Sequence, residues 1–311
     1  MNNSLLLDIL NIVEKTSINC HKWIGKGDNV AADKCATDLM RLELNKLKIK
    51  ISVSIGEGER DNAPMLYIGE QLGMGVEEFE IAVDPLEGTS LCAKGQNGSM
   101  SVIAIGRKNT FVQAPDVYME KIVIGAQYPE DTVKLSLSPK ENLSNLAKFK
   151  KCNVDDLKVI VLNRERHTDL INDIREAGAK IILIEDGDIS ASILAASNDN
   201  DVDMYIGIGG APEGVLAASA LKCIGGHMFC KFIFQNEDQK SRAKKLGIKN
   251  LDAVYSVNDL VKGDVIFAAS GITDGDLVSG VKKGNGYHLV ETLLMDSSQK
   301  KILTVKSKIL E

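Results

Sequence analysis

The spacing of hydrophobic residues changes along the chain from a helical period to a strand-like one. Apolar side chains recur at helical spacing over about residues 4–22 and 30–47, which predicts two amphipathic helices. Between residues 49 and 55 apolar and polar residues alternate, which predicts a half-buried strand that leads into Gly-Glu-Gly at 56–58. Pro64 suits the first turn of a further helix that runs to Gln71.

The rest of the first half consists mainly of short strand patterns, whereas in the second half strand patterns alternate with helix patterns. We expect antiparallel strands at residues 79–84, 101–105 and 117–124, the first of them stopped by Pro85. After a helix start at Ser138, strands and helices alternate as in an α/β layer. The expected strands there are 159–162, 180–184 and 204–208, and the expected helices are 169–177, 189–196 and 212–223.

These patterns predict an α/β fold in which the first half has α+β character. A chain of 311 residues is long enough for two packed lobes. We place the boundary in the polar stretch 140–156, which divides the chain into lobes 1–150 and 151–311. Residues 264–309 return to strand patterns and can pack on either lobe.

Charge and composition narrow the class of partner. Lys and Arg number 37 and Asp and Glu 43, so the formal net charge is −6, and no basic run stands out. This balance argues against nucleic acid or an anionic membrane as the main partner. An acidic protein that acts on an anionic substrate needs metal ions to make its site attractive.

The ends of the chain and its cysteines indicate a cytoplasmic protein. The first helix lacks the positive start and small-residue cleavage site of a signal peptide, and no apolar run is long enough for a membrane span. The six cysteines include no Cys-x-x-Cys pair, which favours reduced thiols. Four scattered histidines argue against a zinc site.

The most informative motif is Asp-Pro-Leu-Glu-Gly-Thr at residues 84–89. A strand delivers Asp84 at its tip, and Gly88 permits a tight turn before Thr89 opens the next segment with free backbone N–H groups. Asp84 and Glu87 can therefore face one point, where they can hold hard cations beside a phosphate. The alternative is a capped turn with solvated acids.

Other carboxylates occupy comparable places. Glu57 stands between glycines at a strand end, a metal-ligand geometry that alone is more often an acidic loop. Glu213 falls in the first turn of a helix that follows Gly-Ile-Gly-Gly-Ala-Pro, where the helix dipole favours an ionised carboxylate. Asp33 near a helix start is by itself usually a cap. Together with Asp84 and Glu87 they form an all-oxygen set, which selects Mg²⁺ or Mn²⁺ for phosphoryl chemistry.

The glycines before Glu213 do not indicate a nucleotide site. Pro212 occupies the place of the final glycine of Gly-x-Gly-x-x-Gly, and no Lys-Ser/Thr of a P-loop follows.

Over nearly its whole length the chain resembles class II fructose-1,6-bisphosphatase, a member of the lithium-sensitive sugar phosphatase superfamily. The runs that carry the resemblance are 56–59, 63–70, 84–89, 114–116 with Tyr118 and Met119, 186–188 and 207–214. The stretch between Phe234 and Lys249 is shorter than in the family. The resemblance implies a layered α/β/α/β/α sandwich, two or more Mn²⁺ or Mg²⁺ ions, and a homodimer or homotetramer.

The resemblance also implies the site residues. The metal ligands it implies are Asp33, Glu57, Asp84, Glu87 and Glu213. We expect the hydroxyl of Thr89 to be hydrogen-bonded to Asp33 or Glu57 and to orient the attacking water or relay its proton. The residues that it implies contact the substrate are Glu87, Gly88, Thr89, Tyr118, Arg164, Glu165, Arg166, Asp186, Gly187, Asp188 and Gly210. From the residues alone, a solvated surface pair is the favoured interpretation of the two arginines. Asp186–Asp188 can equally be an ordinary turn, and Tyr118 can occupy a core position.

The implied reaction is hydrolysis of the 1-phosphate of fructose 1,6-bisphosphate in gluconeogenesis. The first alternative is a dual enzyme that also acts on sedoheptulose 1,7-bisphosphate. Inositol phosphates and nucleotide 3′-phosphates fit the motifs less well. A catalytically inactive sugar-phosphate sensor would be expected to have lost a ligand or the hydroxyl, whereas all five carboxylates and Thr89 are present.

Overall fold

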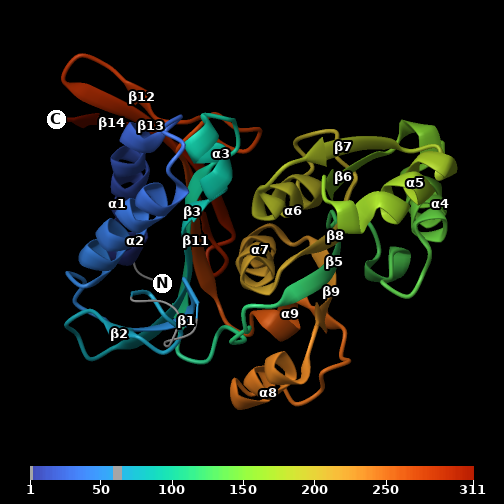
Figure 1. Cartoon of the computed structure of the whole chain (residues 1–311), viewed down its shortest axis with the longest axis horizontal. Coiled ribbons are helices and arrows are strands. Elements are labelled where there is room, and N and C mark those ends of the chain that lie inside the picture. Colours follow the sequence, from blue (N-terminus) through green and yellow to red (C-terminus); the bar gives the residue numbers. More distant parts are fainter. Residues whose placement is uncertain (1–2, 59–64) are drawn as a thin grey trace. The chain divides into compact units, whose positions relative to one another are not determined.

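The computed structural model describes residues 3–58 and 65–311 and divides the chain into two compact units (Figure 1). Unit 1 comprises residues 1–114 and 261–311, and unit 2 comprises residues 115–260. Unit 2 is thus inserted between two segments of unit 1. Among the described residues, no helix combines the length and apolar character that a membrane span requires.

Unit 1 is built on a mixed sheet with the strand order β12-β13-β11-β4-β3-β1-β2, and β14 pairs with β13. Only β1 and β3 run parallel among its described neighbours, and the other pairs are antiparallel. The strands are β1 (Lys50–Ile55), β2 (Gln71–Leu72), β3 (Glu78–Glu87), β4 (Met100–Arg107), β11 (Val265–Gly271), β12 (Lys282–Lys283), β13 (Tyr287–Asp296) and β14 (Lys301–Leu310).

Helices cover one face of this sheet. The helices of unit 1 are α1 (Asn3–Cys20), the 3₁₀ turn η1 (His21–Trp23), α2 (Asn29–Leu44) and α3 (Thr89–Lys94). Apolar residues of α1 and α2, such as Ile9 and Met40, form one core with Val53, Ile81 and Ile103 of the strands. Their helical spacing in the sequence therefore predicts the buried face correctly.

Unit 2 is built on a second mixed sheet with the order β10-β9-β5-β8-β6-β7. Strands β7, β6 and β8 are parallel, whereas β5 is antiparallel to β8 and β9. The strands are β5 (Tyr118–Ile124), β6 (Lys158–Leu162), β7 (Lys180–Ile184), β8 (Met204–Gly210), β9 (His227–Ile233) and β10 (Tyr255–Ser256).

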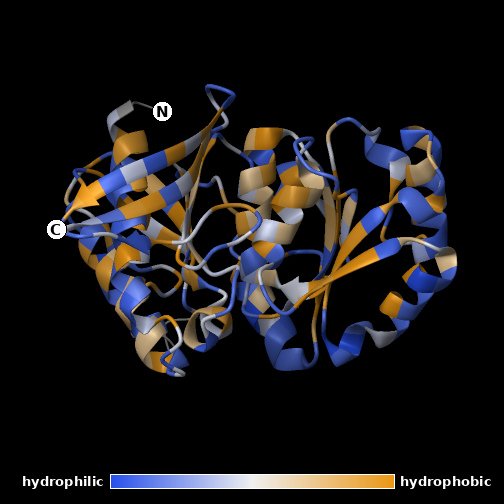
Figure 2. Cartoon of the chain, turned by 90° about the horizontal axis from the view of Figure 1, so that it is seen from above, coloured by the Kyte–Doolittle hydropathy of each residue, from blue (hydrophilic) through white to orange (hydrophobic). Residues whose placement is uncertain are grey.

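Helices cover both faces of the second sheet, so unit 2 has three layers. Helices α4 (Pro139–Lys150) and α5 (Thr168–Ala177) lie on one side of it, and α6 (Asp188–Ala196) and α7 (Ala211–Ile224) on the other (Figure 1). The strands of unit 2 are mostly hydrophobic, whereas its helices carry both hydrophobic and hydrophilic residues (Figure 2). The remaining elements are η2 (Glu130–Thr132), η3 (Val154–Asp156), η4 (Glu165–His167), α8 (Glu237–Lys245) and α9 (Val257–Leu260).

The α/β class is confirmed, but the compact units differ from the predicted lobes 1–150 and 151–311. Strand β5 belongs to unit 2 because it pairs with β8 and β9. The strands after residue 264 return to unit 1 because β11 pairs with β4. Most of the stretch 140–156, predicted to be a polar boundary loop, is helix α4, whose start at Ser138 has a capping box.

Two local predictions also need correction. Strand β3 does not stop at Pro85 but continues to Glu87, since a register shift against β4 between Asp84 and Glu87 accommodates the proline, which has no N–H to donate. The helix predicted from Pro64 to Gln71 begins outside the described residues. Its described part has no helical turn, and Gln71 belongs to β2.

Candidate active site

In unit 1, three of the four candidate metal ligands lie where two parallel strands end. Ile55 of β1 is paired in register with Ala82 of β3. Glu57 and Asp84 each follow this pair by two residues, so both lie at the same edge of the sheet. Glu87 ends the same strand, and a carboxylate oxygen of Asp84 lies within 4.8 Å of one from Glu87. The two carboxylates of the turn thus face a common point, as the motif predicts.

Backbone and side-chain hydrogen bonds fix the turn that carries these acids. The N–H of Leu86 donates to Oδ1 of Asp84 over 3.1 Å. The hydroxyl of Ser99 donates to the carbonyl of Glu87 over 3.1 Å. Gly88 has φ 75°, the left-handed region that glycine enters without strain, and is the N-cap of α3. The tight turn predicted at Gly88 is present.

The hydroxyl of Thr89 has a different partner from the one expected. It donates to the carbonyl of Leu86 over 2.9 Å rather than to the carboxylate of Asp33 or Glu57. This bond uses the only hydrogen of the hydroxyl but leaves lone pairs on Oγ1. Thr89 can therefore accept a hydrogen bond from a water molecule in this conformation.

Asp33 lies within α2, beyond the true N-cap of that helix. The cap is Asp28, whose Oδ1 accepts the N–H of Ala31 over 2.9 Å, so Asp33 is not needed there. The start of α2 packs on α3, and Nδ2 of Asn29 lies 3.4 Å from Oγ of Ser90. Burial raises the pKa of Asp33 above its ordinary value. A nearby cation would favour its ionised form and lower that pKa.

The loop that holds Glu57 depends on a residue that the sequence analysis did not single out for this purpose. The N–H of Glu57 donates to the carbonyl of Leu66 over 3.0 Å. Glu70, only 5% exposed, accepts the N–H of Leu66 over 2.5 Å and pairs with Nε of Arg41 at 2.7 Å. Glu70 thereby anchors the described end of the loop beside Glu57.

In unit 2, the predicted substrate residues also follow the ends of parallel strands. Strands β6, β7 and β8 are followed by residues 164–166, residues 186–188 and the start of α7. Tyr118 begins β5 and stands opposite Gly210 at the end of β8. All these segments reach one edge of the sheet, which is where α/β sheets bind ligands.

Arg166 is held in a defined orientation at this edge. Its Nε and Nη2 donate to the carbonyl of Ile208 over 3.0 and 2.8 Å. Its guanidinium carbon lies 4.7 Å from the centre of the Tyr118 ring, and Tyr118 is 39% exposed. The cation–π contact and the two hydrogen bonds orient a permanent positive charge, which suits an anion-binding group.

Arg164 and Glu165 do not take part in these contacts. Nη1 of Arg164 lies 3.7 Å from a carboxylate oxygen of Glu185, an exposed pair. Glu165 begins η4, and its carbonyl accepts the hydroxyl of Thr168 over 2.8 Å. The alternative that Arg164 is a solvated surface charge therefore fits its surroundings.

Asp186, Gly187 and Asp188 form the entry to α6. Gly187 has φ 92° and is the N-cap, and its N–H donates to Oδ1 of Asp186 over 3.1 Å. Asp188 is buried, and its Oδ2 lies 2.5 Å from Nζ of Lys121. The two aspartates thus have different surroundings, a distinction that the Asp-Gly-Asp motif does not reveal.

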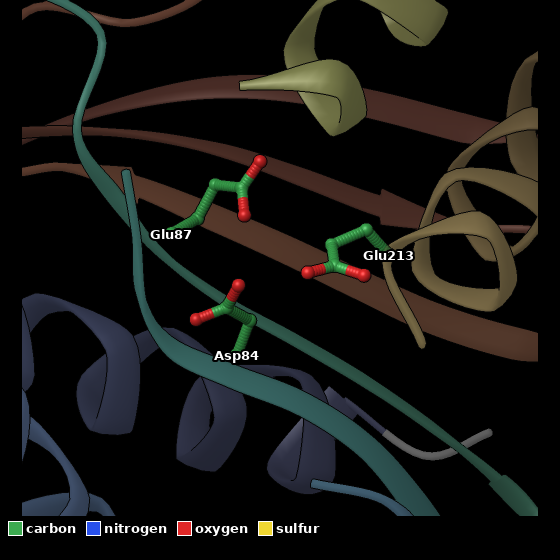
Figure 3. A group of neighbouring side chains, drawn as sticks. All are labelled: Asp84, Glu87 and Glu213. Atoms are coloured by element: carbon green, nitrogen blue, oxygen red, sulfur yellow. The ribbon is translucent and has the colours of Figure 1, made fainter. Parts of the chain in front are cut away.

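The glycines before Glu213 are required by close packing. Figure 3 shows Glu213 at the start of α7, and Asp84 and Glu87 on β3. A Cβ added at Gly210 would lie 1.8 Å from a carboxylate oxygen of Glu213. A Cβ added at Gly209 would lie 2.0 Å from Oδ2 of Asp188. Glycine therefore lets both carboxylates fold back on the end of β8.

His167 is a buried group at the same edge that the sequence analysis missed. Its Nδ1 lies 2.8 Å from the carbonyl of Leu162, and its Nε2 accepts the N–H of Ile208 over 2.8 Å. These contacts require a neutral ring with the hydrogen on Nδ1. Burial, with the nearby arginines, lowers its pKa. His167 and Arg166 thus hold the two sides of Ile208.

Comparison with known proteins assigns the family. Residues 3–309 match the model of the family "bacterial fructose-1,6-bisphosphatase, glpX-encoded". The chain belongs to this family. The resemblance seen in the motifs is confirmed, and it extends through both units.

Relatives of this fructose-1,6-bisphosphatase family align over nearly the full chain. A protein of Synechococcus sp. (strain JA-3-3Ab), named D-fructose 1,6-bisphosphatase class 2/sedoheptulose 1,7-bisphosphatase, is 42% identical and the alignment covers 97% of this chain and 94% of the relative. The fructose-1,6-bisphosphatase class 2 of Haemophilus influenzae is 39% identical, with 99% and 96% covered. A solved structure of an extragenic suppressor from Pyrococcus furiosus matches with a TM-score of 0.33 and 11% identity over 60% of this chain and 68% of its own, too little to support an argument.

The donor set fits a divalent metal ion. Asp84 and Glu87 offer converging oxygen ligands, and Glu57 is a further carboxylate at the same edge of the sheet. Hard cations such as Mg²⁺ and Mn²⁺ prefer such ligands.

We predict that His167 makes stability depend on pH. Because its pKa is lower in the folded protein than the ordinary 6.5, the unfolded chain takes up a proton first as the pH falls, and this lowers the free energy of unfolding below about pH 6.5. The slope contributed by one such group reaches at most about 1.4 kcal/mol per pH unit. Urea unfolding at pH 5 to 8, followed by circular dichroism, measures it.

A His167→Gln variant is the comparison, since it removes the titrating ring. The difference in unfolding free energy between wild type and variant should shrink as the pH falls from 7.5 to 5.5. An equal difference at both pH values would show that His167 does not titrate in this way.

Proposed function

We propose that this protein hydrolyses the 1-phosphate ester of fructose 1,6-bisphosphate to fructose 6-phosphate and phosphate. The observation that carries the proposal is the family match over residues 3–309. The carboxylates at the parallel edge of unit 1 and the oriented arginine at the parallel edge of unit 2 support it, because phosphoester hydrolysis needs both cation ligands and anion-binding groups.

Metal ligation by Asp33, Glu57, Asp84, Glu87 and Glu213 is part of the proposal, with Mn²⁺ or Mg²⁺ as the ions. When bound, such ions neutralise phosphate charge and make a water molecule more acidic. Asp84 and Glu87 have the strongest structural support, because their oxygens converge across the turn.

Thr89 is proposed to orient the attacking water through Oγ1. Its hydrogen already donates to the carbonyl of Leu86, so the oxygen is presented as an acceptor. Asp33 or Glu57 then takes up the proton. The raised pKa of Asp33 in the absence of a cation is compatible with that role.

For the substrate, we propose that Arg166 binds the distal phosphate beside Tyr118, since its guanidinium is held at this edge by the Tyr118 ring and the carbonyl of Ile208. The other residues proposed to contact substrate are Glu87, Gly88, Thr89, Arg164, Glu165, Asp186, Gly187, Asp188 and Gly210. Among these Arg164 and Glu165 have the least support, because Arg164 lies near Glu185.

Activity on sedoheptulose 1,7-bisphosphate is the second candidate. The Synechococcus relative carries both activities in its name, whereas the Haemophilus relative is named for one. We further propose a cytoplasmic homodimer or homotetramer that acts in gluconeogenesis.

The deciding experiment is phosphate release from metal-stripped protein. Fructose 1,6-bisphosphate, sedoheptulose 1,7-bisphosphate and inositol 1-phosphate are supplied separately, with and without Mn²⁺ or Mg²⁺. We expect metal-dependent release from fructose 1,6-bisphosphate. No release from any of the three by folded, metal-loaded protein would favour the sensor alternative.

Replacing Thr89 tests its role in orienting water. Thr89→Ala should lower kcat by a factor on the order of 10²–10⁴, with the KM for fructose 1,6-bisphosphate nearly unchanged. Thr89→Ser keeps the hydroxyl and should retain most of the activity. An unchanged kcat in the alanine variant would remove Thr89 from the reaction.

Replacing Glu213 tests metal ligation. Glu213→Ala should raise the Mn²⁺ concentration for half-maximal activity by about tenfold or more, because a carboxylate ligand is lost. Glu237→Ala is the matched control, since Glu237 also lies in the first turn of a helix of unit 2. Equal metal requirements in the two variants would argue against ligation by Glu213.

A further inference from the structure

Lys121 is a buried cation that the proposed reaction does not use. It lies in the middle of β5 and is 1% exposed, the only buried lysine within the described residues. A lysine is rarely buried unless its charge is paired. Its Nζ lies 2.5 Å from Oδ2 of Asp188 and donates to the carbonyl of Gly210 over 2.9 Å.

Both partners of Lys121 are helix starts. Asp188 is the first residue of α6, and Gly210 is the N-cap of α7. One ammonium group therefore ties together the entries of two helices that follow different strands of the sheet. Asp186 and Gly187 directly precede α6, and Glu213 lies in the first turn of α7.

The surroundings of the ion pair are closely packed. The hydroxyl of Tyr205 donates to Oδ2 of Asp188 over 3.4 Å. A Cβ added at Gly209 would lie 3.0 Å from Nζ of Lys121, and one added at Gly214 would lie 2.5 Å from the sulfur of Met119 and 3.6 Å from Cδ of Lys121. The glycines of the 207–214 motif thus leave room for the lysine.

We infer that Lys121 is a positioning residue for substrate binding, which rests on the proposed function. It fixes Asp188 and Gly210, and through them the two segments that carry the proposed substrate residues Asp186 and Gly187 and the proposed metal ligand Glu213. Oδ2 of Asp188 is committed to this ion pair. Asp188 therefore acts mainly by holding the start of α6, and its neighbour Asp186 accepts the hydrogen bonds from the sugar hydroxyls.

The test compares Lys121→Met, Asp188→Asn and the double variant. Lys121→Met leaves a buried carboxylate unpaired and should lower Tm by roughly 5–10 °C. The double variant removes that charge and should regain most of the Tm. At saturating Mn²⁺ its KM for fructose 1,6-bisphosphate should nevertheless stay about tenfold or more above wild type and above the KM of Asp188→Asn alone, which keeps the bond from Lys121 to Gly210, with a smaller effect on kcat than on KM.

A matched control separates positioning from stability. Lys150 pairs with the buried Asp203 at 2.5 Å, on the other side of the same sheet. Lys150→Met should lower Tm without changing KM. If the KM of the Lys121→Met/Asp188→Asn variant does not exceed that of Asp188→Asn, Lys121 serves only to neutralise a buried charge and the inference is wrong.

Amide hydrogen exchange gives a readout that does not depend on activity. In the double variant the first-turn amides of α6 and α7 should exchange about tenfold faster than in wild type, and those of α4 should not change. Unchanged exchange at both helix starts would overturn the inference. Inactivity of the wild type on fructose 1,6-bisphosphate would instead refute the proposed function, and the exchange rates would still decide whether Lys121 holds the two helix starts.

Discussion

In a parallel sheet, the carboxyl ends of neighbouring strands reach the same edge, and the residues after them have no ladder partner. Both units of this protein use that property. In unit 1 it brings Glu57, which follows β1, level with Asp84 of β3. The two strands are nevertheless far apart in the sequence, since Ser54 of β1 donates to Glu80 of β3 across 26 positions. In unit 2 it brings the segments after β6, β7 and β8 to one edge, where Arg166 and Gly210 meet Tyr118 of β5. Among the antiparallel strands, β5 adds Tyr118 to this edge, and the others extend the sheet that supports it.

Close backbone approach is the second requirement, and it explains most of the glycine in the motifs. Gly88 turns the chain in a left-handed conformation between two acids and the threonine. Gly209 and Gly210 do not have a positive φ, but a side chain there would occupy the space of the Asp188 and Glu213 carboxylates. The two kinds of glycine look alike in the sequence, yet one is needed for its torsion angles and the other for its lack of volume.

Local signals predicted much of this structure. The capping box at Ser138, the alternation of strands and helices after it, and the turn at Gly88 all depend on residues close together in the chain. The division into units was not predictable in this way, because it depends on β11 pairing with β4 across more than a hundred intervening residues. Lys121 and His167 were missed for the same reason. A lone lysine in an apolar strand was the available signal, but its meaning lies in Asp188 and Gly210, which come much later in the chain.

The insertion of unit 2 into unit 1 has a consequence for biosynthesis. Strand β11 lies between β4 and β13 in the sheet of unit 1, and it follows the whole of unit 2 in the chain. During translation every strand of unit 2 therefore leaves the ribosome before β11, the neighbour of β4 on one side. Unit 2 can fold first. Until β11 is synthesised, the apolar strand β4 has an unpaired edge, and such edges are prone to aggregation and are bound by chaperones. The order of the segments thus means that unit 1, with its cluster of carboxylates, is completed only after all of unit 2 has been synthesised.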